Sequence, residues 1–229
     1  MKKKIWVAIL NEGNVRQELS RVITNLQTQS AYDVHIDQPS DRPISNSRNK
    51  IVQRFLAHKE FDYLLMIDDD IVPLPTILNL ADYQKDIIGA LCFMYQQNKV
   101  LPVAFKRNRD GLYNPIIAKD REGLLEVDAV GTGCVMLSRK VLEAVKAPFL
   151  NEYDPDGIKT YGLDINFCQK ARKKGFKVFV HLDYPCDHWQ TMNLRRVYAV
   201  NMAYIDRIKS IRKEVKNEYE KKGHKNKGN

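Results

Sequence analysis

The sequence predicts an α/β fold in which a mostly parallel central sheet is flanked by helices and followed by a long C-terminal helix. Strand-like and helix-like segments alternate over the first 70 residues as β-α-β-α-β, which is typical of a largely parallel sheet covered by helices. The run at 63–67 is apolar or aromatic at every position, as expected of a strand covered on both faces. A chain of 229 residues with 44% hydrophobic residues can also bury a substantial core.

The first half of the chain supplies most of the regular pattern. The expected strands are residues 5–10, 32–36 and 63–67. The expected helices are residues 15–27 and a second helix that starts at Ser47 as its N-cap, because both segments repeat apolar residues at helical spacing. The stretch 37–46 contains two prolines and several small polar residues, which predicts a loop.

The second half is less regular. The expected strands are residues 86–93, 103–105, 111–113 and 176–180, with a turn at 108–111. The expected helices are residues 139–145, residues 163–174 ended by Gly175, and a long helix from Asn193. Residues 151–160 read as a polar loop. The sequence shows no internal repeat and no clear linker, which favours one domain.

Composition and terminal sequence exclude several classes of protein. No stretch approaches the roughly 20 apolar residues of a membrane span. The apolar segment behind the basic N-terminus stops at Leu10 and is too short for a cleaved signal peptide, which predicts a cytoplasmic protein. The four cysteines are far apart and form no C-x-x-C pair, so reduced, mostly buried thiols are expected rather than a disulfide framework or zinc site.

The net charge of +9 is concentrated at the C-terminus. Residues 206–229 contain nine Lys and Arg against four Asp and Glu, a net charge of +5. A basic tail favours anionic partners such as a phospholipid surface, a nucleic acid or a phosphorylated acceptor. The amphipathic helix fits peripheral docking on a membrane, but also packing on the core, formation of a homodimer, or a solvated helix that fades into a disordered end.

Three consecutive aspartates, Asp68, Asp69 and Asp70, follow the apolar run at 63–67. Clustered carboxylates repel one another unless a cation neutralises them, and oxygen ligands suit Mg²⁺ or Mn²⁺. The carboxyl ends of strands are also where open α/β sheets bind ligands. Apolar residues return at once at 71–75, which favours the lip of a cleft over a solvated acidic turn.

Three later segments are further candidates. Asp164 stands at the start of a predicted helix, where the dipole keeps it ionised and able to take a proton from a hydroxyl; a plain helix N-terminal charge is the alternative. His188 could complete a metal shell of carboxylate and phosphate oxygens, or be structural. The glycines of 131–133 lack the third glycine of a dinucleotide loop and favour close approach of the backbone to the aspartates.

Taken in order, these segments resemble a GT-A fold glycosyltransferase and are similar to the family 2 inverting enzymes. The matching segments are Ser47-Arg48-Asn49, 61–70, 131–134, Gly162-Leu163-Asp164, 175–178 and His188. The likeness covers residues 4–190, which implies a GT-A catalytic domain at 1–190 and an amphipathic basic helix and tail at 191–229.

The resemblance also implies roles for single residues. Asp68 and Asp70 would form the Asp-x-Asp motif, with Asp70 as the direct ligand of Mn²⁺ or Mg²⁺ and Asp68 nearer the ribose. His188 would be the late metal or diphosphate ligand, and Asp164 the general base. The residues implied to contact the donor nucleotide are Asn11, Glu12, Asp37, Arg48 and Asp68.

The implied reaction moves a sugar from a nucleoside-diphosphate sugar, with UDP favoured by family habit, to an acceptor hydroxyl with inversion. Two positions depart from the family pattern. Leu163 replaces the acidic residue that usually precedes the base, and the loop at 11–14 is not the usual version. The first departure bears on the role of Asp164 and the second on the identity of the nucleobase.

Two other functions compete with this interpretation. A sugar-phosphate nucleotidyltransferase should carry a Gly-rich basic loop directly after the first strand, and residues 11–16 do not supply one. A basic nucleic-acid or membrane-surface binding module, with vestigial or absent transferase activity, would explain the C-terminal charge.

Overall fold

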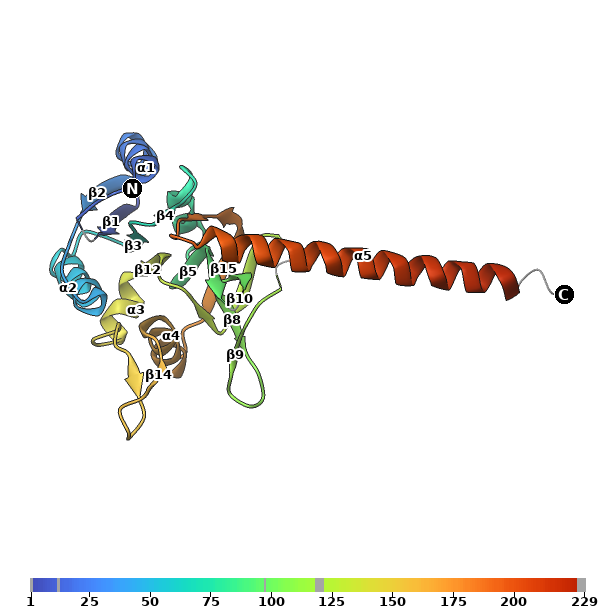
Figure 1. Ribbon diagram of the computed structural model, residues 1–229. Coiled ribbons are helices and arrows are strands. Elements are labelled where there is room, and N and C mark those ends of the chain that lie inside the picture. Colours follow the sequence, from blue (N-terminus) through green and yellow to red (C-terminus); the bar gives the residue numbers. More distant parts are fainter. Residues whose placement is uncertain (1, 12, 97, 118–121, 226–229) are drawn as a thin grey trace. The chain divides into compact units, whose positions relative to one another are not determined.

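The computed structural model describes residues 2–11, 13–96, 98–117 and 122–225 (Figure 1). The chain forms two compact units. The first unit comprises Met1–Met94 and Val100–Trp189, and the second comprises Tyr95–Lys99 and Gln190–Asn229. The predicted boundary between a catalytic domain at 1–190 and a C-terminal segment at 191–229 stays a prediction.

A seven-stranded sheet forms the centre of the first unit, in the order β10-β15-β5-β12-β3-β1-β2. Its strands are β1 (Lys4–Leu10), β2 (Asp33–Asp37), β3 (Tyr63–Asp68), β5 (Ile87–Leu91), β10 (Leu124–Val127), β12 (Cys134–Ser138) and β15 (Val178–Pro185). Strands β1, β2, β3, β5 and β15 run in one direction, while β10 and β12 run against them. The predicted α/β architecture with a mostly parallel central sheet is therefore confirmed.

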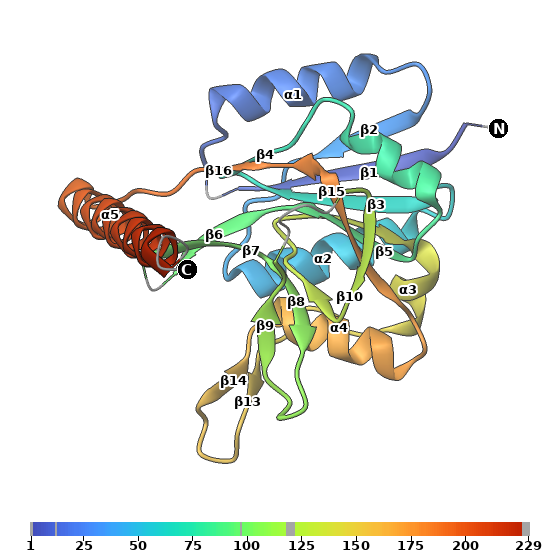
Figure 2. The ribbon, with the colours of Figure 1, turned by 90° about the vertical axis from the view of Figure 1, so that its right-hand side faces the viewer.

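Helices cover both faces of this sheet (Figure 2). They are α1 (Gln17–Thr28), α2 (Ile44–Ala57), α3 (Arg139–Ala144), α4 (Leu163–Lys173) and the 3₁₀ helix η1 (Ile77–Tyr83). Strand β1 shows how the two layers arise, because its side chains alternate between two apolar cores. Ile5, Val7 and Ile9 pack with α1 and η1, whereas Trp6 and Ala8 pack with α2, α3 and α4.

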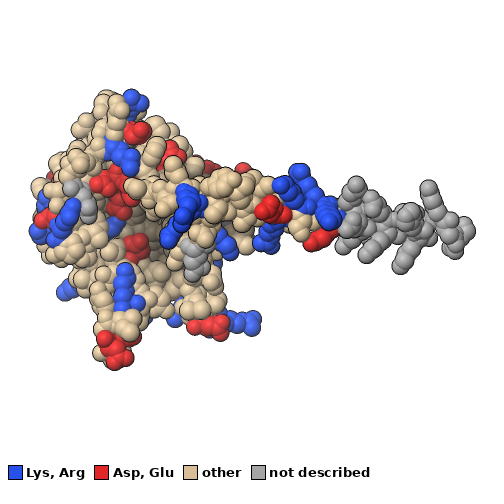
Figure 3. Space-filling view, in the orientation of Figure 1, with Lys and Arg blue, Asp and Glu red and all other residues tan. Residues whose placement is uncertain are grey.

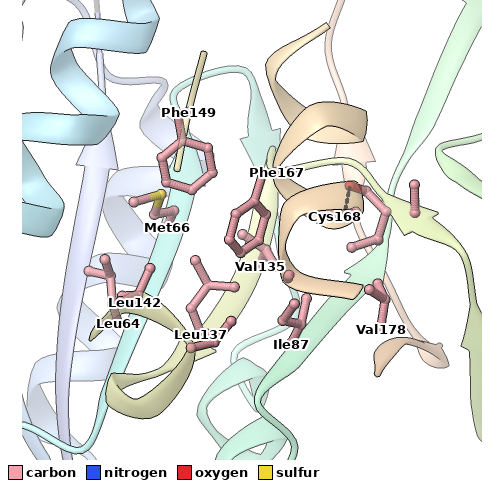
Figure 4. Close-up of a cluster of buried hydrophobic side chains, with 14 of the residues drawn as sticks. Leu64, Met66, Ile87, Val135, Leu137, Leu142, Phe149, Phe167, Cys168 and Val178 are labelled. Atoms are coloured by element: carbon pink, nitrogen blue, oxygen red, sulfur yellow. Dashed lines mark hydrogen bonds between the residues drawn. The ribbon is translucent and has the colours of Figure 1, made fainter. Parts of the chain in front are cut away.

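The second of these cores is drawn in Figure 4. Leu64 and Met66 of β3 and Val135 and Leu137 of β12 belong to it together with Phe167 of α4. All five of these side chains are completely buried. Burial on both faces explains why β3 is apolar throughout rather than alternating.

The remaining strands lie outside the central sheet and are short. They are β4 (Ile71–Val72), β6 (Phe93–Gln96), β7 (Lys99–Pro102), β8 (Ala104–Arg107), β9 (Tyr113–Pro115), β11 (Ala129–Val130), β13 (Glu152–Tyr153), β14 (Lys159–Tyr161) and β16 (Asp187–His188). The turn predicted at 108–111 joins β8 to β9. The polar loop predicted at 151–160 is instead the β13–β14 hairpin, whose short strands are too exposed to show an apolar pattern.

Local sequence signals predict one of two helix boundaries correctly. Gly175 ends α4 as predicted, because it adopts a φ of +87° that glycine tolerates, and its N–H donates to the Arg172 carbonyl at 2.9 Å. The prediction that Ser47 caps α2 is wrong. The helix begins at Ile44, directly after Pro43, and Ser47 is buried within it at 1% exposure. Ser47 therefore lies inside the helix, and its polar side chain does not mark the helix start.

The second unit contains α5 (Leu194–Lys225), the long helix that the sequence predicts from Asn193. The Asn193 side-chain oxygen accepts the backbone N–H of Arg195 at 3.0 Å, as an N-cap does. Among the helices in the described ranges, none is both long enough and apolar enough to cross a membrane.

All four cysteines, Cys92, Cys134, Cys168 and Cys186, are free and buried, which confirms the expectation of reduced, buried thiols. Burial raises the pKa of Cys168 to about 12. Interaction with the Cys186 thiol, followed by burial, raises the pKa of Cys92 well above its usual value.

We expect these thiols to resist alkylation in the folded protein, because thiolate and not thiol is the nucleophile and little thiolate forms. A thiol-reactive chromophore at mildly alkaline pH should label the native chain very slowly. The same chain unfolded in guanidinium chloride should release the signal of four thiols at once. Rapid labelling of the native chain would contradict this prediction.

Candidate active site

The three aspartates lie at the carboxyl edge of the central sheet, between β1 and β12. Leu10 at the end of β1 is opposite Asp68 in the parallel pair β1–β3. The Asp69 N–H donates to the Leu10 carbonyl at 3.0 Å, and the Asp68 N–H donates to the Gly133 carbonyl at 2.8 Å. These backbone bonds fix the start of the triplet, because both neighbouring strands hold it.

A cleft opens beside the triplet. It has a volume of about 360 Å³, within the range of small-molecule sites. The residues that line it are Leu10, Asn11, Asp41, Ile44, Asp68, Asp69 and Asp70. Figure 3 shows acidic side chains gathered beside and inside a hollow on the face of the molecule that it draws.

Asp68, the last residue of β3, is held by Arg48 of α2, the helix that precedes this strand in the chain. Nη2 of Arg48 donates to both carboxylate oxygens of Asp68, at 2.6 and 2.8 Å. The same nitrogen lies 3.4 Å from the carbonyl of Thr132. Arg48 is only 3% exposed, and the Asp68 side chain is 26% exposed. The buried guanidinium of Arg48 therefore neutralises Asp68 from the protein interior, while Asp68 still lines the cleft.

The electrostatics of Asp68 show how much negative charge gathers here. Burial raises the pKa of the Asp68 carboxyl, and Arg48 opposes this rise. The charges of Asp164 and Asp70 raise the pKa of Asp68 further. Three carboxylates from two separate parts of the chain thus act on one another, which favours a cation at this edge.

Asp70 is paired with His188. Nε2 of His188 lies 3.1 Å from Oδ2 of Asp70. Nδ1 is in hydrogen-bond contact with the carbonyl of Phe93. The pairing of β4 with β16, in which His188 is opposite Ile71, fixes the histidine backbone. The N–H of Trp189 also donates to the Asp70 carbonyl at 2.9 Å.

This pair is suited to a metal ion. A carbonyl can only accept, so Nδ1 of His188 donates to the Phe93 carbonyl and Nε2 is the nitrogen that faces the Asp70 carboxylate. Nε2 and Oδ2 of Asp70 lie 3.1 Å apart, so a cation beside them could be bound by both. A carbonyl that fixes the tautomer of a ligand histidine is a common outer contact in metal sites. Asp70 and His188 therefore fit Mn²⁺ or Mg²⁺ as two donors of a shell.

The protein does not supply a complete shell by itself. Within residues 2–11, 13–96, 98–117 and 122–225, no group of three His, Cys, Asp or Glu is arranged to hold a metal ion. The remaining positions would fall to water or to oxygens of a bound ligand, which is common for Mg²⁺ sites that work on phosphates.

Asp164 lies in the first turn of α4, after Gly162. Its Oδ1 accepts a hydrogen bond from the hydroxyl of Thr132 at 2.5 Å. Thr132 is fully buried and stands between β11 and β12. Because its carbonyl also faces Arg48, Thr132 links the Arg48–Asp68 pair to Asp164. Thr132 was not predicted as a site residue, since only its flanking glycines carry a sequence signal.

Gly133 lies against the triplet, in line with the expectation that a glycine lets the backbone approach the aspartates. A Cβ added at Gly133 would lie 3.5 Å from Oδ2 of Asp68 and 3.3 Å from Cγ1 of Ile71. A side chain at this position would therefore fill space next to the carboxylate, where a ligand could lie.

Of the residues predicted to contact the nucleotide, some line the cleft and others do not. Asn11 lines the cleft, and its amide donates to the Pro39 carbonyl at 3.3 Å. Glu12 lies outside the described residues. Asp37 pairs with Arg54 at 3.1 Å. Asp41, which the sequence did not single out, lines the cleft instead. It belongs to the connection between β2 and α2, where composition predicts irregular backbone and no pattern distinguishes one residue.

Comparison with known proteins gives a fold and no family. No protein-family model matches the chain, and no curated protein matches its sequence. Among solved structures, A197 from STIV matches with a TM-score of 0.54 and 17% identity, over 83% of this chain and 87% of that one. At that identity, the shared feature is the fold alone.

Two further structures match more weakly. GalNAc-T7, crystallised with UDP, GalNAc and Mn²⁺, gives a TM-score of 0.48 and 11% identity over 87% of this chain and 47% of that one. TarS 1–349 from S. aureus gives a TM-score of 0.45 and 14% identity over 81% and 60%. With TM-scores below 0.5, neither bears on the site of this chain.

Proposed function

We propose that this chain is a metal-dependent glycosyltransferase of the GT-A type, similar to the inverting family 2 enzymes. It would move a sugar from a nucleoside-diphosphate sugar, with UDP favoured, to an acceptor hydroxyl. The observation that supports this most is the meeting of three groups at one sheet edge. These groups are the Arg48–Asp68 pair, the Asp70–His188 pair and the Asp164–Thr132 pair.

Each pair has a distinct task in this proposal. Asp70 and His188 would hold the divalent cation, which would supply positive charge for the diphosphate that leaves. Arg48 fixes the position of Asp68, which faces the ribose of the donor. Asn11 and Asp41 line the part of the cleft assigned to the nucleoside.

Asp164 is the proposed general base. The Thr132 hydroxyl fixes Oδ1 of Asp164, so Oδ2 is the proposed proton acceptor. It would deprotonate the acceptor hydroxyl as that hydroxyl attacks the anomeric carbon from the face opposite the diphosphate. This geometry requires inversion at that carbon. Leu163, in place of the usual acidic residue, leaves Asp164 as the carboxylate of the first turn of α4.

Replacement of Asp70 by alanine tests the metal site. A thermal-shift screen of nucleoside diphosphates and sugar nucleotides, with and without Mn²⁺, should first identify the donor, since a ligand that binds only the folded state raises the melting temperature. The wild-type chain should hydrolyse that donor only with Mn²⁺. Asp70→Ala should lose both the hydrolysis and the Mn²⁺-dependent part of the shift.

Asp33→Ala is the matched control. It removes the same charge at the opposite end of the sheet, where Asp33 starts β2 and lies 3.7 Å from Lys4 in an exposed pair. Hydrolysis should persist in this variant. Hydrolysis by Asp70→Ala at the wild-type rate would contradict the metal site. Failure of every sugar nucleotide to bind would favour the binding-module alternative.

A further inference from the structure

Helix α5 presents two different faces within the second unit. Small side chains face the turn between β6 and β7, which belongs to the same unit. The residues that line the hollow between turn and helix are Asn98, Lys99, Arg196, Ala199, Val200 and Ala203. The large apolar side chains of the helix lie elsewhere on its circumference.

These large side chains form a stripe that we call the α5 stripe. Its members lie on one side of the helix, with a gap at 199–203, and are Leu194, Val197, Tyr198, Tyr204, Ile205, Ile208, Ile211 and Val215. Several are strongly exposed: Leu194 is 79% exposed, Tyr204 65% and Ile211 49%. Single exposed apolar residues are ordinary, but a group of them on one side of a helix marks an interaction surface.

The stripe is bordered by positive charge. Residues of α5 include ten Lys and Arg against four Asp and Glu, so the helix carries +6 of the net charge of +9. Successive residues on a helix are about 100° apart, so Arg207 and Lys209 lie on either side of Ile208. Figure 3 shows the blue Lys and Arg side chains on the described part of this helix.

The α5 stripe and the positive charges of the helix together favour one kind of partner over two others. A second copy of α5 would bring together two helices that each carry a net charge of +6, which costs electrostatic energy. A nucleic acid would bind the basic residues and leave the apolar stripe in water. An anionic lipid surface accepts both, because acyl chains take the stripe and phosphates take the bordering cations.

We propose that α5 docks on the surface of an anionic phospholipid membrane, with the α5 stripe between Leu194 and Val215 facing the lipid. The helix would lie in the plane of the interface rather than cross it. This inference rests on the charge and exposure of α5 and does not depend on the proposed transfer reaction.

Vesicle flotation with the full-length chain tests the proposal. The probes are vesicles of phosphatidylcholine alone and of phosphatidylcholine with phosphatidylserine. Ile211→Glu places a negative charge on the stripe. Ser210→Glu places the same charge on the opposite face, where the Ser210 hydroxyl lies 3.2 Å from Oε1 of Glu214. Both positions are exposed, so neither change should unfold the chain, and circular dichroism should confirm equal helix content.

The wild-type chain and Ser210→Glu should float with the anionic vesicles and much less with the neutral ones. Ile211→Glu should bind at least about tenfold more weakly than Ser210→Glu, because an apolar side chain that enters the lipid is lost. Added salt should weaken binding by screening the cations. Equal binding by the two variants would overturn the proposal, as would no flotation by the wild type. A dimer in sedimentation that only Ile211→Glu dissociates, without flotation, would assign the stripe to a second copy instead.

Discussion

Replacing Arg48 by alanine is expected to lower the free energy of unfolding by about 3 kcal/mol. The substitution leaves Asp68 without the guanidinium that bonds both of its oxygens, in a place where Asp70 and Asp164 already repel it. Breaking a buried ion pair costs about 3–5 kcal/mol, and the lower end applies because Asp68 is 26% exposed and water can reach it. Urea unfolding followed by circular dichroism measures this change.

Arg54→Ala is the control for this experiment. Arg54 belongs to the same helix and also pairs with an aspartate, Asp37, at 3.1 Å. Its side chain is 46% exposed, whereas that of Arg48 is 4% exposed, so the loss should be smaller than that of Arg48→Ala although Asp37 is itself only 16% exposed. In a double-mutant cycle, Asp68→Asn should recover part of the cost of Arg48→Ala, because the unpaired charge is then absent. Equal losses in the two arginine variants would contradict the buried pair.

Replacing Asp164 by asparagine is expected to slow sugar transfer by about 10²- to 10⁴-fold while donor binding stays unchanged. Asparagine has the same shape and its side-chain oxygen can still accept the Thr132 hydroxyl, but it cannot take a proton from the acceptor. The measurement compares kcat for transfer with the dissociation constant of the donor, in the presence of Mn²⁺.

Thr132→Val separates positioning from proton transfer. It removes the hydroxyl that fixes Oδ1 of Asp164 but keeps the carboxylate, so the loss in kcat should be smaller than that of Asp164→Asn. The anomeric configuration of the product gives an independent check by nuclear magnetic resonance. A product with retained configuration would overturn the role of Asp164, as would wild-type transfer by Asp164→Asn.

Errors in the predicted elements come from segments whose pattern was weak or ambiguous. The hairpin of β13 and β14 was predicted as a loop because its exposed strands carry polar residues and a central turn. Ser47 resembled a helix N-cap, yet α2 starts three residues earlier, at Ile44. The burial of Ser47 within the helix depends on tertiary packing, which the local sequence does not show.

The α/β fold class, the buried strand β3 and the three aspartates at its end could all be predicted from local sequence patterns. Local apolar periodicity and turn residues are sufficient for these features, because they depend on neighbours only a few positions apart. They place the carboxylates at a sheet edge before any contact is known.

The contacts of those carboxylates, in contrast, depend on packing between distant parts of the chain. Arg48 reaches Asp68 across 20 positions, and His188 reaches Asp70 across 118. Thr132 meets Asp164 because β11, which precedes Thr132, packs on α4, while β12, which follows it, lies between β3 and β5. No local pattern encodes such pairs, since the order of strands in a sheet is set by long-range packing of their side chains. The sequence thus fixes which groups end at the edge, and packing decides which of them become partners.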